Sequence, residues 1–224
     1  MKLYMHPVSM TSRPVRLFIA ESGIKIDEQV VDLMKGEHMS PEYAALNPNR
    51  MVPMIEDGDF RLTESSAILK YLADKFDLPS YPKDLKKRAK VNEMLDWLNS
   101  QFYREWGYHL CYPQVFPHHK RRTDEAHSAT VDWGVEQSKR WMQVLNDHWI
   151  GPKNQYLCGN EITIADYFGA CLVSVGDLIQ FDFGKYPNVA RWLANMKKLK
   201  NWGPVNEVFD GFAASNKGKQ FATV

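Results

Sequence analysis

The segment from residue 49 to residue 66 restricts the fold of this chain more than any other stretch. Its Pro53 stands at the head of a short apolar strand, where a missing backbone N–H is tolerated. The pair Asp57-Gly58 is typical of a hairpin turn, so a second short strand is expected at residues 60–62. Helical apolar spacing then starts at residue 67, after three hydroxyl side chains that can cap a helix: Thr63, Ser65 and Ser66. A proline-headed strand beside such a helix N-terminus, which also carries a carboxylate, predicts a site for a small, extended, peptide-like anion.

Strands and helices alternate in the part of the chain before this segment. Leu3–Met5 is a predicted strand, and Pro14 opens a helix at its first turn, where proline fits best. A second strand is predicted at Gln29–Leu33, and a short helix at Pro41–Leu46. Together with the hairpin and the helix after it, the order is β-α-β-α-β-β-α. This order predicts a mixed four-stranded sheet between helices.

The sequence changes character between residues 77 and 82, where two prolines and the lack of periodicity predict a linker. Beyond it, apolar spacing predicts only helices, the longest at about residues 85–106 and 123–149. Further helices are expected from Thr163, after Pro187 and after residue 204. Thr163 and Asp166 have the spacing of a capping box, which we interpret as a folding device. The sequence therefore predicts an α/β domain at residues 1–76 and an all-helical domain at residues 83–224.

Composition and charge argue against several functional classes. Apolar residues make up 44% of the 224 residues, charged residues make up 25%, and the formal net charge is +1. This balance argues against a disordered chain and gives no electrostatic reason to expect binding to nucleic acid or to an anionic membrane. No window approaches 18 uninterrupted apolar residues, so we expect no membrane span.

The cysteines and histidines predict a reducing compartment and no metal. The three cysteines are scattered without any paired spacing, and no signal segment is visible at the N-terminus. We therefore expect a cytoplasmic protein without a disulfide framework. His118 and His119 are adjacent, but the sequence offers no third ligand beside them, so no metal site is predicted.

Five segments, in this order and at these spacings, give the chain a full-length resemblance to the cytosolic glutathione transferases. They are Ser12–Arg16, Val31–His38, Asn47–Pro53, Thr63–Ile68 and Thr163–Asp166. The patterns S-x-P-x-R and V-D-L-x-K-G-x-H are similar to those of the theta class and its bacterial relatives. The resemblance implies a thioredoxin-like N-terminal domain, an all-α C-terminal domain, a homodimer, a role in detoxification, and glutathione as cosubstrate.

Glutathione reacts as a thiolate, but with a reference pKa near ~8.5 only about 3% of the thiol is ionised at pH 7. An enzyme of this family therefore has to stabilise the anion. A hydroxyl donor at the N-terminus of the first helix does so through a charge-assisted hydrogen bond and the helix dipole. Ser12, two residues before Pro14, is the predicted donor. Ser9, which follows His6-Pro7 as in some related classes, and Thr11 are the alternatives in the same loop.

The resemblance assigns glutathione binding mainly to the hairpin segment. It implies a cis peptide bond before Pro53, so that the backbone of Val52 faces outward and pairs with the cysteinyl part of the tripeptide. Ser65, at the start of the third helix, suits the γ-glutamyl carboxylate, and Glu64 suits the ammonium group. His38 suits the glycine carboxylate.

Met51 departs from the theta-like pattern, in which a lysine often stands at this position. Methionine cannot pair with a carboxylate, so we expect His38 or Arg50 to hold the glycine end of glutathione. The second substrate, a small electrophile, is expected between the domains. Its predicted walls are on or after the first long helix: Tyr103, Arg104, Trp106, Tyr108 and Tyr112. Arg104 is either a solvated side chain or a group that helps to bind the thiolate.

Two other functions use the same fold. A glutathione-dependent reductase or peroxidase normally has a cysteine in the loop before the first helix, whereas the first cysteine of this chain is Cys111. A noncatalytic binding or scaffold module keeps the fold without the site, yet Ser12, His38, Glu64 and Ser65 occur together here. The sequence therefore favours the transferase.

Overall fold

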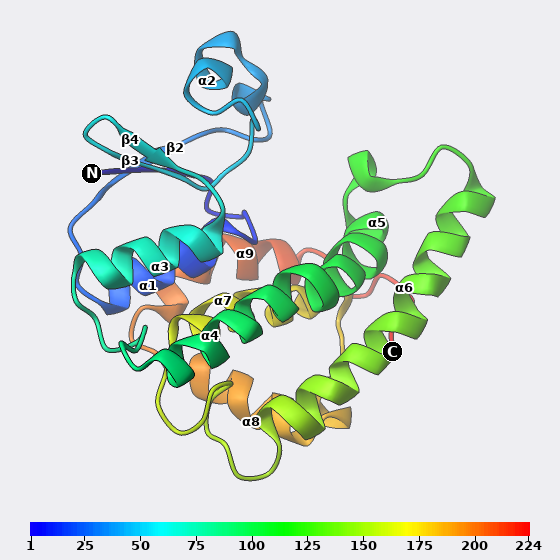
Figure 1. Cartoon of the computed structure of the whole chain (residues 1–224). Helices are drawn as coiled ribbons and strands as arrows, with labels where there is room; N and C mark the ends of the chain where they lie inside the picture. The colour runs from blue at the N-terminus through cyan, green and yellow to red at the C-terminus, as the bar shows by residue number, and fades with distance from the viewer.

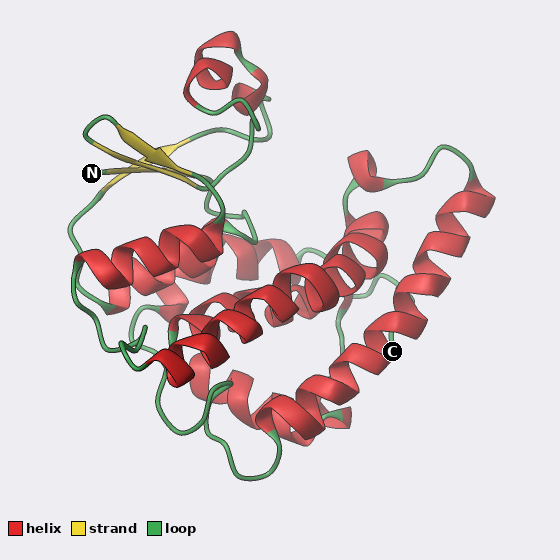
Figure 2. Cartoon of the chain, viewed as in Figure 1, coloured by secondary structure: helices red, strands yellow, loops and turns green.

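The computed structural model describes all 224 residues. The four strands of its sheet lie in the N-terminal third of the chain, and helices make up the rest (Figures 1 and 2). The predicted fold class is confirmed: a mixed four-stranded sheet of the thioredoxin-like type is followed by an all-helical part.

The sheet has the strand order β2-β1-β3-β4. Strand β1 (Lys2–Met5) pairs in parallel with β2 (Asp27–Val30) and antiparallel with β3 (Met54–Asp57). The hairpin partner of β3 is β4 (Phe60–Leu62), as the turn residues predicted. The segment that precedes β3 therefore enters the sheet at one of its two central strands.

The second strand ends earlier than the sequence predicted. We expected it at Gln29–Leu33, but it spans Asp27–Val30 and is exposed along its whole length. The carboxylate of Asp32 accepts hydrogen bonds from the backbone N–H groups of Met34 (3.0 Å) and Lys35 (3.1 Å). These bonds close a turn directly after the strand. Aspartate side chains often bind nearby backbone N–H groups in this way and so compete with pairing in a sheet.

Helices α1 (Ser12–Glu21) and α3 (Ser65–Lys75) cover one face of the sheet, while α2 (Pro41–Leu46) stands beyond the other face (Figure 1). A short 3-10 turn at Glu37–Met39 leads into α2. The predicted bounds of α2 are confirmed, because Ser40 caps it by accepting the N–H of Tyr43 at 3.1 Å.

The first helix of the all-helical part is longer than predicted. α4 (Leu85–Trp97) continues through π-helical turns at Leu98–Phe102 and Arg104–Cys111 into α5 (Tyr112–Val115). Helix α6 (Asp124–Val144) continues in the same way to Ile150. The remaining helices are α7 (Ile164–Val173), α8 (Pro187–Met196) and α9 (Trp202–Ala214), with 3-10 turns at Pro117–His119, Ser174–Ile179 and Phe183–Lys185.

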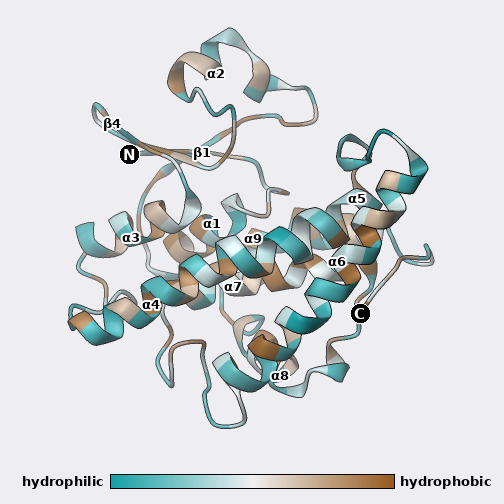
Figure 3. Cartoon of the chain, turned by 45° about the vertical axis from the view of Figure 1, so that its right-hand side comes forward, coloured by the Kyte–Doolittle hydropathy of each residue, from teal (hydrophilic) through white to brown (hydrophobic).

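Helix α7 is the centre of the helical part, and all ten of its residues are buried. Its predicted capping box is confirmed: Asp166 accepts the N–H of Thr163 at 2.8 Å, and also the indole N–H of Trp192 at 2.9 Å. The core around α7 is continuous with the core beneath the sheet, from Leu3 in β1 to Phe209 in α9. In Figure 3 helix α4 is mostly hydrophilic, and its buried residues are Val91, Met94 and Leu95.

Candidate active site

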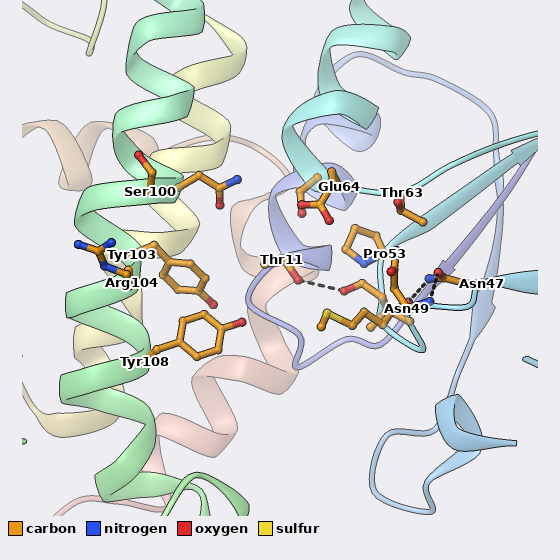
Figure 4. A pocket seen from close by; sticks show the side chains of 14 residues that line it. Thr11, Asn47, Asn49, Pro53, Thr63, Glu64, Ser100, Tyr103, Arg104 and Tyr108 are labelled. Carbon is orange, nitrogen blue, oxygen red and sulfur yellow. Dashed lines mark hydrogen bonds between the residues drawn. The ribbon is translucent and has the colours of Figure 1, made fainter. Parts of the chain in front are cut away.

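Two adjoining cavities of about 430 Å³ and about 800 Å³ lie between the sheet domain and the helix α4–α5. Both are lined by residues of the two parts of the chain. The residues that border both cavities are Thr11, Asn49, Met51, Val52, Tyr103 and Tyr108. Figure 4 shows the smaller cavity, with Tyr103 and Tyr108 directed from the helix toward Thr11 and Pro53.

The loop before β3 forms the floor of the smaller cavity. Its Val52–Pro53 peptide bond is cis, as the resemblance implied. The Met51 carbonyl accepts hydrogen bonds from the Tyr43 hydroxyl (2.7 Å) and from Asn47 Nδ2 (2.8 Å), both on or after α2. The Val52 carbonyl accepts the hydroxyl of Thr11 at 3.0 Å. This loop is therefore held from both sides, and its backbone presents a fixed edge to the cavity.

The turn before α3 supplies the opposite border of the same cavity. Glu64 has φ +66° and ψ 112°, a backbone conformation that is rare for any residue with a side chain. Such outliers persist where the surrounding structure enforces them, and they cluster at ligand sites. Thr63, Glu64 and Ser65 all line the cavity, and Ser65 begins α3. A carboxylate and the amino end of a helix thus face one space.

The loop before α1 contains the three hydroxyl candidates, and the structure separates them. Ser9 and Thr11 line the larger cavity, and Thr11 also lines the smaller one. Ser12, the donor predicted from the sequence, is 0% exposed, lines neither cavity, and its Oγ has no hydrogen-bond partner. It lies on the inner side of the first turn of α1, because that turn begins earlier than Pro14 suggested. A ligand in the cavities does not reach it.

Ser9 lies in the turn just before α1, whose N-cap residue is Thr11. The Ser9 carbonyl accepts the N–H of Arg13 at 3.0 Å, and its Oγ accepts the N–H of Ser12 at 3.2 Å. The single proton of the Thr11 hydroxyl is donated to the Val52 carbonyl. In the contact between Ser9 and Thr11, 3.3 Å long, Ser9 is therefore the donor, and the distance exceeds that of an ordinary hydroxyl hydrogen bond. Because its contact with Thr11 is long, the Ser9 proton can turn to a ligand at a smaller cost than the Thr11 proton.

Three tyrosines of the continuous helix from α4 to α5 form the facing wall: Tyr108 lies in the π-helical turns at Arg104–Cys111, and Tyr103 and Tyr112 lie directly before and after these turns. The hydroxyls of Tyr103 and Tyr112 are hydrogen-bonded to each other, and burial raises the pKa of both. Burial and the charge of Glu64 raise the pKa of Tyr108, so all three phenols stay protonated at neutral pH. The ring of Tyr103 packs where a Cβ on Gly107 would stand, only 2.6 Å away, so glycine is required at that position.

Trp106 is not part of the cavity wall, and this prediction is wrong. The helix turns its indole into the core, where it is 0% exposed and donates to the Val173 carbonyl at 3.2 Å. Arg104 does line the smaller cavity, but its Nε donates to the buried carboxylate of Glu105 at 2.7 Å. Figure 4 shows its guanidinium group directed away from Thr11.

The remaining predicted glutathione-binding residues lie along the larger cavity. His38, Arg50 and Met51 line it, and Arg50 has φ +53°. The Nδ1 atom of His38 is buried and has no hydrogen-bond partner within the protein. Met51 is 63% exposed.

Several lining residues were not predicted. In the smaller cavity, Asn99 and Ser100 lie one turn before Tyr103 and Arg104 on the same helix, so helical spacing could have revealed them. His118 and His119 in the larger cavity were considered only as metal ligands, and burial lowers the pKa of His119. The others have no pattern of their own: Asn47, Asn49 and Thr63 in the smaller cavity, and Val8, Met10, Leu33, Met34, Met39 and Phe116 in the larger one.

Neither a metal centre nor a membrane segment is apparent. No three side chains of the metal-binding types His, Cys, Asp and Glu are grouped so that they could hold an ion. No helix combines the length and the apolar character that crossing a membrane requires.

The fold and the cleft define a class of two-domain proteins, with a thioredoxin-like domain ahead of a helical one, and comparison with known proteins identifies the family. A family model for "Glutathione S-transferase, N-terminal domain" matches residues 1–74, and one for "Glutathione S-transferase, C-terminal domain" matches residues 114–200. The chain belongs to the glutathione S-transferase family.

Its relatives include human glutathione S-transferases theta-2B and theta-1, each 34% identical over 80% of this chain and over 71% and 72% of the relative, respectively. Among solved structures, human theta-2 in complex with glutathione and an unknown ligand has a TM-score of 0.83, with 28% identity over 99% of this chain and 92% of that one. A delta-class glutathione transferase of Nilaparvata lugens has a TM-score of 0.78, with 30% identity over 96% of this chain and 98% of that one. The predicted resemblance to the theta class is confirmed.

Proposed function

We propose that this protein conjugates glutathione to a small electrophile in the interdomain cleft. The observation that carries the proposal is the position of a hydroxyl donor, Ser9, at the N-terminus of α1, on the same cleft as the Val52–Pro53 loop and the start of α3. An extended peptide-like anion bound across these three elements would bring its sulfur to the hydroxyl.

Ser9, rather than Ser12, is the proposed donor to the thiolate. A hydroxyl that already accepts an N–H of the helix start has its own proton available for a charge-assisted hydrogen bond. The amino end of α1 adds a favourable dipole at the same place. Lowering the thiol pKa by two units requires about 2.7 kcal/mol, which these two contributions together can supply. Thr11 has a structural role in this scheme, since it holds the Val52 carbonyl.

The tripeptide itself is bound by fixed backbone and by two charged side chains. We propose that the backbone of Val52 pairs with the cysteinyl unit, while Glu64 holds the ammonium group and Ser65 with the N-terminus of α3 holds the γ-glutamyl carboxylate. The position of His38 on the larger cavity supports its assignment to the glycine carboxylate. Arg50 on the same cavity takes the role that the exposed thioether of Met51 cannot.

The electrophile would occupy the larger cavity, whose volume of about 800 Å³ exceeds that of the smaller one. Tyr103, Tyr108 and Tyr112 supply aromatic surface, and methionine side chains supply polarizable, adaptable surface. Tyr108 also carries a protonated hydroxyl toward the site of reaction. Arg104 is proposed to contribute its aliphatic stem rather than its charge.

We further propose a cytoplasmic, homodimeric protein with a role in detoxification. The support for a dimer is exposed apolar surface on α6 and β4, where Trp133 is 52% and Phe60 is 44% exposed. Light scattering that gives a persistent 26.0 kDa monomer at micromolar concentration would contradict the dimer.

The experiment that tests the proposed function combines retention on immobilised glutathione with a conjugation assay over a panel of electrophiles. Retention together with conjugation supports the transferase. Retention without conjugation of any electrophile would point to a noncatalytic binding module. Disulfide reduction catalysed by the protein would contradict the proposal. We do not expect this activity, because Cys111 and Cys171 are buried and burial raises the pKa of Cys158 to about 12.

A further inference from the structure

Arg13 is a buried cation that has no carboxylate partner. It directly follows the loop that carries Ser9, and its side chain is 0% exposed. None of the ion pairs in the structure includes it. An isolated buried charge is costly, so a guanidinium group in this place needs a physical explanation.

Neutral acceptors hold the guanidinium group. Its Nε donates to Asn206 Oδ1 at 2.7 Å, and its Nη2 donates to Ser174 Oγ at 2.5 Å and to the Cys171 carbonyl at 3.2 Å. Its plane lies over the ring of Phe209, 3.5 Å from the centroid. Cys171 and Ser174 are at the C-terminal end of α7, where the helix dipole is negative. These groups stabilise the cation without cancelling its charge.

The charge lies directly beneath the floor of the larger cavity. Arg13 Nη1 contacts the sulfur of Met10 at 3.5 Å, and Met10 lines that cavity next to Ser9. The positive charge of Arg13 also acts on Tyr103, whose pKa it lowers against the larger raising effect of burial. One layer of side chains therefore separates the guanidinium group from the space in which the thiolate is proposed to bind.

The titratable groups near Arg13 form no ion pair with it. Asp210 on α9 has its pKa raised by burial and lowered by Arg13, but makes no ion pair with it. Asp177 is already paired with Lys197 at 2.9 Å. Cys171, packed against the guanidinium group, has its pKa raised by burial to about 11 and so stays neutral at pH 7. Arg13 is therefore a buried positive charge with which none of these groups forms an ion pair.

We propose that Arg13 is a positioning residue that anchors the Ser9 loop to the helical domain and, as a fixed buried cation, stabilises the thiolate bound beside Ser9. This inference rests on the proposed function. In general, a unit charge roughly 10 Å from a thiol, in a medium of effective dielectric constant ~20, shifts the thiol pKa by about one unit. The electrostatic part of this role can be separated from the anchoring part.

The test uses three variants of the full chain. Arg13→Met removes the charge and keeps an unbranched apolar stem. Ser174→Asp keeps Arg13 and places a carboxylate against its Nη2, so the charge is neutralised while the buried group stays paired. Ser174→Ala is the control, because it removes a hydrogen bond and keeps the charge. The measurement is the pKa of the thiol in the complex with glutathione, followed by thiolate absorbance.

We expect Arg13→Met and Ser174→Asp to raise the thiol pKa by about half a unit to one unit, and Ser174→Ala to leave it unchanged. If Arg13→Met does not fold, Ser174→Asp decides alone. If the thiol pKa of bound glutathione is lowered in the wild type and equally lowered in Ser174→Asp, this inference is overturned but the proposed function is not. A wild-type complex with the pKa of free glutathione would overturn the proposed function, and this inference with it.

Discussion

The two domains build their halves of the cleft from different parts of the polypeptide. The sheet domain presents backbone at the Val52–Pro53 loop and at the N-termini of α1 and α3, together with polar side chains next to these elements, such as those of Ser9 and Glu64. The helical domain presents mainly side chains that project from the continuous helix between α4 and α5, from Asn99 to Tyr112. Backbone that is held by the fold can recognise a constant ligand, whereas projecting side chains can change without loss of the fold. This difference matches a constant cosubstrate and a variable electrophile.

Removal of the proposed donor should have the largest effect on activity. In Ser9→Ala the hydroxyl is lost while the α1 dipole stays, so conjugation should fall roughly ten- to a thousandfold, the range for one preorganised donor to a developing or full charge. Steady-state kinetics at saturating glutathione would measure this. Thr11→Ala is the control and should cost less. A smaller loss in Ser9→Ala than in Thr11→Ala would reverse their roles.

Loss of the Glu64 carboxylate should weaken glutathione binding. A hydrogen bond to a charged group contributes about 1.5–3 kcal/mol, so Glu64→Ala should raise the KM for glutathione by roughly ten- to a hundredfold, with a smaller change in kcat. Glu64→Gln is a matched variant that keeps the size of the side chain and should recover part of the affinity. An unchanged KM for glutathione would show that the tripeptide binds elsewhere.

Weaker anchoring of the Val52–Pro53 loop should have a smaller effect on glutathione binding by the sheet domain. Tyr43→Phe removes one of the two donors to the Met51 carbonyl and leaves Asn47 in place. A neutral hydrogen bond is worth about 1 kcal/mol, so the KM for glutathione should rise about threefold to fivefold. The KM for the electrophile should not change. Equal effects on both substrates would mean that the loop serves the whole cleft.

Substitutions in the helical domain's side of the cleft should change the kinetics for the electrophile and not those for glutathione. Tyr108→Phe removes a hydroxyl that makes no bond within the protein, so kcat/KM should change by about threefold for some electrophiles and not for others. Trp106→Phe is the control: it should lower stability by about 1–3 kcal/mol and leave the kinetics unaltered, because Trp106 is a core residue. Kinetic effects from Trp106→Phe would put that residue back in the cavity.

The elements that the sequence predicts correctly are those that a few neighbouring residues specify. The hairpin, α2 and the capping box are specified by local residues, such as the Asp57-Gly58 turn and the hydroxyl of Ser40, so they were predicted correctly. The early end of β2 depends on Asp32, whose carboxylate stabilises a turn in place of further strand pairing.

The direction of individual side chains was harder to predict. In the sequence, Ser9 and Ser12 both precede the helix expected at Pro14, but α1 begins at Ser12, and this earlier start decides which of the two serines faces the cleft. Trp106 and Tyr108 are two residues apart, yet one is 0% and the other 42% exposed. Aromatic composition does not reveal this difference, and the π-helical turns shift the register that an α-helix would have.

The thiol pKa of bound glutathione in Ser9→Ala and Ser12→Ala tests the central claim most directly. The wild-type complex should show thiolate absorbance near pH 7. In Ser9→Ala the pKa should rise part of the way toward that of the free tripeptide, by about one unit, which corresponds to ~1.4 kcal/mol. In Ser12→Ala it should not move, and stability should be equal or higher, since a buried hydroxyl without a partner is removed. A pKa that rises in Ser12→Ala and not in Ser9→Ala would contradict the account.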